Sequence, residues 1–126
     1  MRGELPLQLS IDDRPIEAHS TYSWAGGGTV LTISTVLPEE GIAAELISTY
    51  VGHAHTRTVV THLMRGPINH PADIRTTKHE HLNPVVHARE CAYDHTQELI
   101  EALRAAGHRA SVHLDELSFA QLEQVE

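Results

Sequence analysis

Histidine is the residue type that offers this chain most of its chemistry. The sequence contains eleven histidines in 126 residues, and seven of them fall between His53 and His87. Histidine titrates near neutral pH and is the commonest metal ligand in proteins. Because the histidines are scattered from His19 to His113, they are not a purification tag. The sequence therefore predicts chemistry in the middle of the chain, by metal binding or by proton transfer.

Two histidine pairs have a spacing that suits metal binding. One residue separates His53 from His55, and one separates His79 from His81. In an extended segment, side chains two residues apart project to the same side, so each pair can offer two imidazoles to one ion. A zinc site takes three or four ligands from His, Cys and carboxylates. The candidate ligands for Zn or another divalent transition metal are therefore His53, His55, His79, His81 and Cys91.

A second pattern lies on a predicted helix, where His87, Cys91 and His95 follow one another at intervals of four residues. Side chains four apart are neighbours on a helix flank. The two histidines are about 12 Å apart at a helical rise of 1.5 Å per residue, so the three cannot share one ion. The competing interpretation is a half-buried cysteine beside histidines that bond to the backbone. The candidates for acid–base or nucleophilic chemistry are His79, His81, His87, Cys91 and His95.

Other features favour structural interpretations. His62 shares a strand face with Val60 and Met64, which is typical of a hydrogen-bonded core or sheet histidine. The run Gly26–Gly28 lies between two predicted strands, whereas a phosphate-binding loop needs a helix N-terminus after it. No serine lies in a Gly-x-Ser-x-Gly elbow. The sequence thus contains no complete catalytic motif.

Composition restricts the function classes. The formal net charge of −8 argues against nucleic-acid binding, which needs a basic surface. A single cysteine excludes an intramolecular disulfide and fits a reducing compartment. The apolar runs are too short to span a membrane, and no leader opens the chain, so we expect a soluble, cytoplasmic protein. Eight arginines against one lysine are typical of GC-rich genomes, such as those of actinobacteria and their phages.

Hydrophobic periodicity predicts the elements. Alternating apolar residues indicate strands over 5–11, 16–24 and 29–37, which we expect to form an antiparallel meander. Pro38, two glutamates and a helical apolar face predict a helix over 39–51. A strand with apolar residues on both faces follows over 56–64 and is expected to be central. Residues 65–86 read as one long functional or mobile loop. A second helix over 84–106, a strand over 110–114 and a short helix from 118 complete the chain.

These elements predict one α+β domain over residues 1–126, in the order β-β-β-α-β-long loop-α-β-short α. Both main helices are expected on one face of a mostly antiparallel sheet, which leaves the other face open. Aromatic residues make up 4% of the chain, so the core is thin. We therefore expect a homo-oligomer in which another subunit covers the open face.

Two functions fit the sequence. The first is a small binding or accessory protein that acts as a homo-oligomer through its sheet face and histidine-rich loop, with a protein or small molecule as its ligand. The second is a small enzyme, metal-assisted or using histidine as acid and base. Its site would lie between loop 65–86 and the helix that carries His87, Cys91 and His95. The first is favoured because no catalytic motif is complete.

Overall fold

The computed structural model describes residues 2–5, 7–16, 18–25, 30–37, 44–52, 57–66, 73–78 and 84–114. Ten elements lie in these ranges. In chain order they are β1 (Arg2–Glu4), β2 (Leu7–Ile11), β3 (Arg14–Ile16), β4 (His19–Ala25), β5 (Val30–Leu37), β6 (Ala44–Val51), β7 (Arg57–Arg65), β8 (Asp73–Lys78), α1 (Pro84–Ala105) and β9 (Ala110–Leu114).

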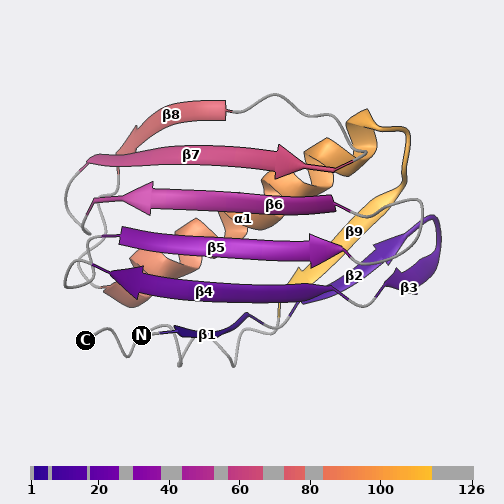
Figure 1. The fold of residues 1–126 in the computed structure, drawn as a ribbon, viewed down its shortest axis with the longest axis horizontal. Coiled ribbons are helices and arrows are strands. Elements are labelled where there is room, and N and C mark those ends of the chain that lie inside the picture. Colours follow the sequence, from indigo (N-terminus) through magenta and orange to yellow (C-terminus); the bar gives the residue numbers. More distant parts are fainter. Residues whose placement is uncertain are drawn as a thin grey trace.

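The larger sheet has six antiparallel strands in the order β1-β4-β5-β6-β7-β8 (Figure 1). From β4 to β8 each strand pairs with the next strand in the chain. The β-branched and aromatic residues of these segments favour extended structure. This meander sets the register on which both faces of the sheet depend.

A second, three-stranded sheet has the order β3-β2-β9. The β2–β3 hairpin turns at Asp12 and Asp13, whose φ angles are 52° and 65°. Two consecutive residues with positive φ match the twist of a tight hairpin, and aspartate tolerates this conformation better than most residues. The last described strand, β9, pairs with β2 over its whole length, so residues 7–11 and 110–114 meet in this sheet.

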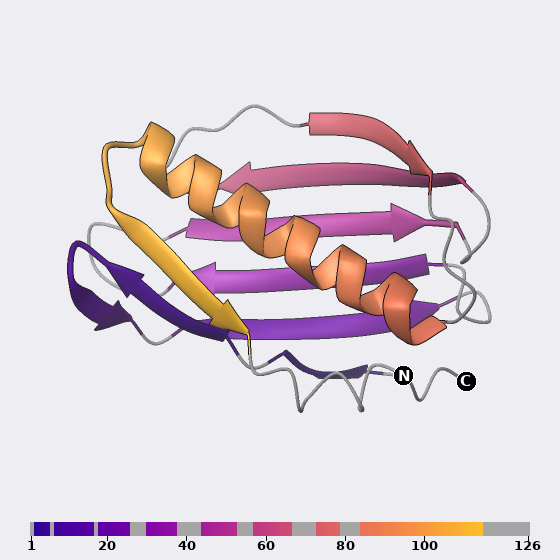
Figure 2. The same cartoon turned by 180° about the vertical axis from the view of Figure 1, so that it is seen from behind.

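Helix α1 crosses one face of the larger sheet diagonally, and the small sheet lies beside it on the same side (Figure 2). The helix ends at Ala105, and Gly107 just beyond it has a φ of 92°. The amides of Gly107 and His108 bond back to the carbonyls of Arg104 and Leu103. This is the Schellman arrangement, which satisfies the last carbonyls of a helix and turns the chain, here into β9.

The core lies between this helix and the sheets. Along β4, β5, β6 and β7, buried and more exposed residues alternate, as expected when one sheet face is covered. The fully buried aliphatic side chains include Leu31, Ile33, Leu46, Leu99 and Leu103. The covered face therefore holds the hydrophobic core, and the other face of the larger sheet is open in the described part of the chain.

The structure corrects the helix predicted over 39–51. Residues 44–51 form strand β6, and residues 38–43 lie outside the described part. The apolar residues Leu46 and Tyr50 fit a helical period, but together with Ala44 they also fit a period of two, and all three are buried. Pairing with β5 and β7 decided between the periods. One helix, not two, therefore covers the larger sheet among the described residues.

Two further predictions were wrong. Residues 73–78 form strand β8, so 65–86 is not one continuous loop. The first three predicted strands do not form one meander, because Ile16 ends β3 in the small sheet whereas β4 begins at His19 in the larger one. The turn at Asp12 and Asp13 folds β3 back onto β2 and so separates the two sheets.

Other expectations were confirmed. The strands predicted near 29–37, 56–64 and 110–114 are β5, β7 and β9, and the helix predicted over 84–106 is α1. Strand β7 is internal, between β6 and β8. The short helix predicted from residue 118 lies outside the described residues. Within the described part, no helix is long and apolar enough to cross a membrane.

Candidate functional site

A continuous chain of buried polar side chains lies between α1 and the larger sheet. Its members come from four neighbouring strands and from the helix, and all bond through side-chain atoms. In order they are Ser20 of β4, Thr35 of β5, His95 of α1, Ser48 of β6, His62 of β7, Asp94 of α1 and Tyr50 of β6. We call these seven residues the histidine network.

His95 is the centre of the network. Its side chain is fully buried, and both ring nitrogens have partners. Nε2 lies 2.7 Å from Oγ1 of Thr35, and Nδ1 lies 2.6 Å from Oγ of Ser48. Ser20 continues the chain, with its hydroxyl 2.7 Å from that of Thr35. Because buried polar groups are costly unless paired, these bonds fix the helix at one position on the sheet.

The other half of the network reaches the protein surface. Nδ1 of His62 lies 2.6 Å from Oγ of Ser48, and its Nε2 lies 3.0 Å from Oδ2 of Asp94. The Tyr50 hydroxyl donates to the same carboxylate oxygen at 2.8 Å. The side chain of Asp94 is 27% exposed, whereas that of His62 is 1% exposed. Asp94 is thus the point at which the network meets solvent.

The ionised carboxylate of Asp94 orients the other hydrogen bonds, because it can only accept them. A neutral His62 then carries its proton on Nε2, and its Nδ1 accepts from the Ser48 hydroxyl. Ser48 in turn accepts from Nδ1 of His95, whose Nε2 accepts from Thr35, and Thr35 accepts from Ser20. Every proton in the chain therefore points toward Asp94.

Burial also sets the charge states in and beside the network. It is the main reason that the pKa of His95 falls to about 3, with His62 adding to the effect and Asp94 opposing it. Burial likewise raises the pKa of Tyr50, aided by Asp94. It raises the pKa of the Cys91 thiol too, with Asp94 and Glu90 contributing. At neutral pH these three groups are uncharged.

The network contains a serine, a histidine and an aspartate in contact, which is the set that nucleophilic catalysis uses. The enclosure of Ser48 argues against that use, because its side chain has no exposed surface. Its hydroxyl already lies between two imidazoles, so no substrate atom can approach it in this arrangement. The network is instead suited to holding α1 on the sheet.

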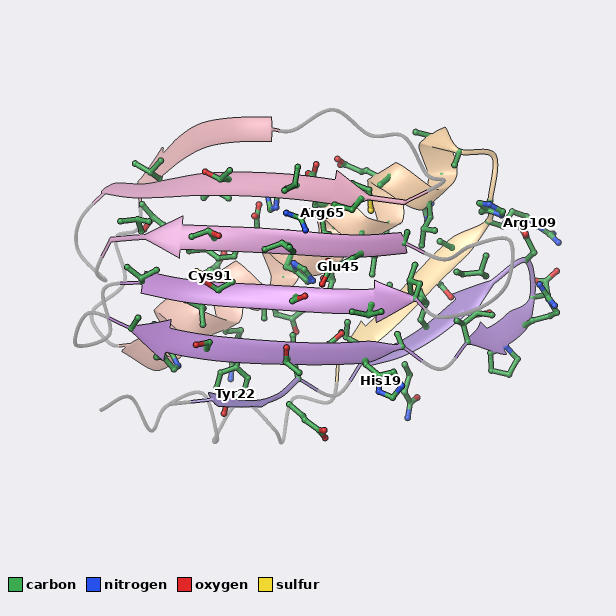
Figure 3. The ribbon with its side chains drawn as sticks, in the orientation of Figure 1. His19, Tyr22, Glu45, Arg65, Cys91 and Arg109 are labelled. Carbon is green, nitrogen blue, oxygen red and sulfur yellow. The ribbon has the colours of Figure 1, made fainter. Side chains whose placement is uncertain are left out.

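Of the predicted catalytic candidates, the structure describes the side chains of Cys91 and His95, and neither of these two lies at an open site. His95 and Cys91 lie on the buried side of α1, and both are at most 1% exposed. Figure 3 shows Cys91 behind the larger sheet. His87 lies in α1, but its side chain is outside the described part, as are residues His79 and His81. The high pKa of the Cys91 thiol makes it a poor nucleophile.

The metal prediction concerns mostly residues outside the described ranges. His53, His55, His79 and His81 all lie there, and Cys91 is the one candidate ligand whose surroundings are described. Among the described residues, no group of three or more His, Cys, Asp or Glu side chains could hold a metal ion. Zn or another divalent transition metal at the four outlying histidines stays a prediction.

Sequence reasoning missed most of the histidine network. Ser48 and Tyr50 fell within the helix predicted over 39–51, which placed Tyr50 on its apolar face but not Ser48. Asp94 stands among several acidic residues of the predicted helix, a pattern typical of a solvated face, yet it contacts His62 and Tyr50. The signal that could have found them is the alternation of Ala44, Leu46, Ser48 and Tyr50, which places all four on one strand face.

The second candidate surface is the open face of the larger sheet, formed by the outward residues of β4–β7. Cross-strand register arranges it in four rows. The apolar row is Ala25, Val30, Val51 and Val59; the hydroxyl row is Ser23, Thr32, Thr49 and Thr61; the mixed row is Thr21, Ser34, Ile47 and Leu63; and the charged row is His19, Val36, Glu45 and Arg65. Of these sixteen side chains, Glu45 and Arg65 alone carry a formal charge.

The open face also carries most of the exposed large apolar side chains among the described residues. Val36, Val51, Val59 and Leu63 are between 37% and 46% exposed there. Depletion of charge combined with exposed apolar residues is characteristic of the central part of a protein interface. The open face therefore has the composition of a contact surface.

Comparison with known proteins adds no relative. No family model, no curated protein and no solved structure matches the chain.

Proposed function

We propose that this protein is a small non-catalytic binding protein that works as a homodimer through the open face of its larger sheet. The observation that carries the proposal is the contrast between the two faces of that sheet. One face is covered by α1 and the small sheet (Figure 2). The other face, at the sixteen register-paired positions of β4–β7, exposes four large apolar residues and carries two formal charges. In this proposal the histidine-rich segments bind the ligand, a protein or a small molecule.

The size of the open face supports a stable contact. A strand of eight residues, such as β5 or β6, is about 26 Å long, and four strands span about 19 Å. Their product is about 500 Å² of projected surface per subunit. Two such faces together reach about 1,000 Å², which is the lower range of specific interfaces. A dimer of moderate affinity is therefore expected.

The alternative function, a small enzyme with a histidine as acid and base, has less support. Its best-placed groups are Ser48, His62 and His95, and each has an exposed fraction of 1% or less. A catalytic base must come within hydrogen-bond reach of the proton that it removes, which enclosure of these groups prevents. His79 and His81, which would help to complete such a site, lie outside the described residues.

The native mass of the purified, untagged protein tests the proposal. Light scattering at micromolar concentration should give twice the chain mass of 13.9 kDa. Leu63→Arg, which places a charge on the open face, should give a folded monomer, because the Leu63 side chain is already 37% exposed.

The matched control is Tyr93→Arg, because Tyr93 is 42% exposed and lies on α1 instead of on the sheet. This variant should remain a dimer. A wild-type protein that is monomeric at all concentrations, or a Leu63→Arg variant that stays dimeric, would contradict the proposal.

A further inference from the structure

The rows of the open face restrict how two copies can meet. A two-fold axis parallel to the strands lays each row over the same row of the partner, whereas an axis across the strands lays the apolar row over the charged row. The first arrangement matches apolar with apolar and hydroxyl with hydroxyl groups. It also agrees with the aligned packing of stacked β-sheets, which cross at about 30°.

The position of this axis among the strands then decides the contacts. An axis between β5 and β6 would lay Glu45 over the partner's Val36 and Arg65 over the partner's His19. An axis between β6 and β7 lays Glu45 over the partner's Arg65. Each of these two charged side chains then faces a side chain of opposite charge. Figure 3 shows Glu45 and Arg65 at the same end of these two neighbouring strands, where they are register partners.

On β6 and β7, the same axis position also matches the other three rows. It lays Ile47 of β6 over the partner's Leu63, Thr49 over the partner's Thr61, and Val51 over the partner's Val59, following the β6–β7 register. Three of the four most exposed apolar residues of the open face lie on these two strands, namely Val51, Val59 and Leu63. The axis thus places these three side chains at the centre of the contact, while β5 lies over the partner's β8 and β4 lies outside the contact.

We infer that the partner is a second copy of this chain, related by a two-fold axis that runs along the strands between β6 and β7. Glu45 of each copy then pairs with the partner's Arg65, at the same end of the interface. Such an interface is isologous, because the same surface of both subunits is used. This inference rests on the proposed function and adds to it the register of the dimer.

Charge reversal tests the register. Glu45→Arg should bring two positive charges together at each contact, and Arg65→Glu should bring two negative charges together. Each variant alone should therefore dissociate at least tenfold more readily than wild type in sedimentation velocity at low salt. An equimolar mixture of the two should form a heterodimer that is more stable than the homodimer of either variant, because both contacts between the subunits then pair opposite charges. The double variant E45R/R65E should form a homodimer again.

Glu101→Arg is the matched control, since it makes the same charge change at an exposed position of α1 and should leave the dimer unchanged. Two results would overturn the register while the proposed function stands. One is that wild type dimerises but the single variants have the same dissociation constant as wild type. The other is that mixing the two variants does not restore a dimer. If wild type is a monomer, the proposed function itself fails. Thermal melts of each variant confirm that it is folded.

Discussion

Lowering the pH should destabilise the protein in a way that can be traced to His95. This imidazole is fully buried and neutral in the folded state, with its pKa lowered to about 3 mainly by burial. In the unfolded chain its pKa returns to about 6.5. Between these two values the unfolded state binds a proton that the folded state does not. The contribution of His95 to stability is therefore full above pH 6.5 and is lost progressively as the pH falls toward 3.

The size of the effect follows from these two pKa values. Between pH 7.5 and pH 5.5 the folded state stays unprotonated at His95, while the unfolded state gains nearly one proton. The free energy of unfolding should therefore fall by about 1.4 kcal/mol from this residue alone. With an unfolding entropy of about 2.1 cal/mol/K per residue, a chain of 126 residues should melt about 5 °C lower.

Variants separate this contribution from those of the other ten histidines. In His95→Gln, the difference in unfolding free energy between pH 7.5 and pH 5.5 should be smaller than in wild type by about 1.4 kcal/mol. His19→Gln changes an exposed histidine and should keep the wild-type difference. The unfolding free energies of wild type and of both variants are measured by denaturant titration at pH 7.5 and pH 5.5.

An NMR titration of the wild-type protein gives a second measurement that does not depend on a variant folding. The ring signals of His95 should not move between pH 8 and pH 5, because burial lowers its pKa to about 3. A His95 ring that titrates near pH 6.5, or an unchanged pH difference in His95→Gln, would refute the argument from burial.

Three further outcomes follow from the structure. Nitrogen NMR at neutral pH should find the proton of His62 on Nε2 and that of His95 on Nδ1, and the opposite tautomers would contradict the role of the Asp94 carboxylate. Cys91 should react with a thiol reagent at pH 8 only on unfolding, because it is 1% exposed and its pKa is raised by burial; fast labelling of folded protein would show that the thiol is accessible. Asp12→Ala should lower the melting midpoint at pH 7, since the Asp12 carboxylate accepts hydrogen bonds from the Arg109 amide and from His108. Because those bonds lower the Asp12 pKa, the difference in melting midpoint from wild type should shrink as the pH falls toward 3. An equal difference at both pH values would indicate another cause.

The segment 39–51 shows why the fold was predicted only in part. Its apolar residues satisfy a helical period and a period of two at once, so local pattern could not choose between them. Pairing partners on both sides, β5 and β7, made the strand the better solution. Strand β8 had no apolar alternation to reveal it, since its sequence is Asp-Ile-Arg-Thr-Thr-Lys. The helix α1 was predicted well because 22 residues with a long apolar stripe between Pro84 and Gly107 admit one interpretation.

The sequence by itself determined the elements whose signals are local. These are helix α1 and the glycine that follows it, strands β5, β7 and β9, and the turn at Asp12 and Asp13. The sequence also shows directly that histidine is abundant. Tertiary structure decided what those residues do. His62 and His95 are 33 residues apart in the chain and meet only because α1 crosses β6 and β7, where Ser48 joins them. The open face is likewise a product of register across four strands, because a row of hydroxyls or a pair such as Glu45 and Arg65 exists only after the strands have aligned. Local propensity acts over a few residues, whereas these contacts depend on the whole meander.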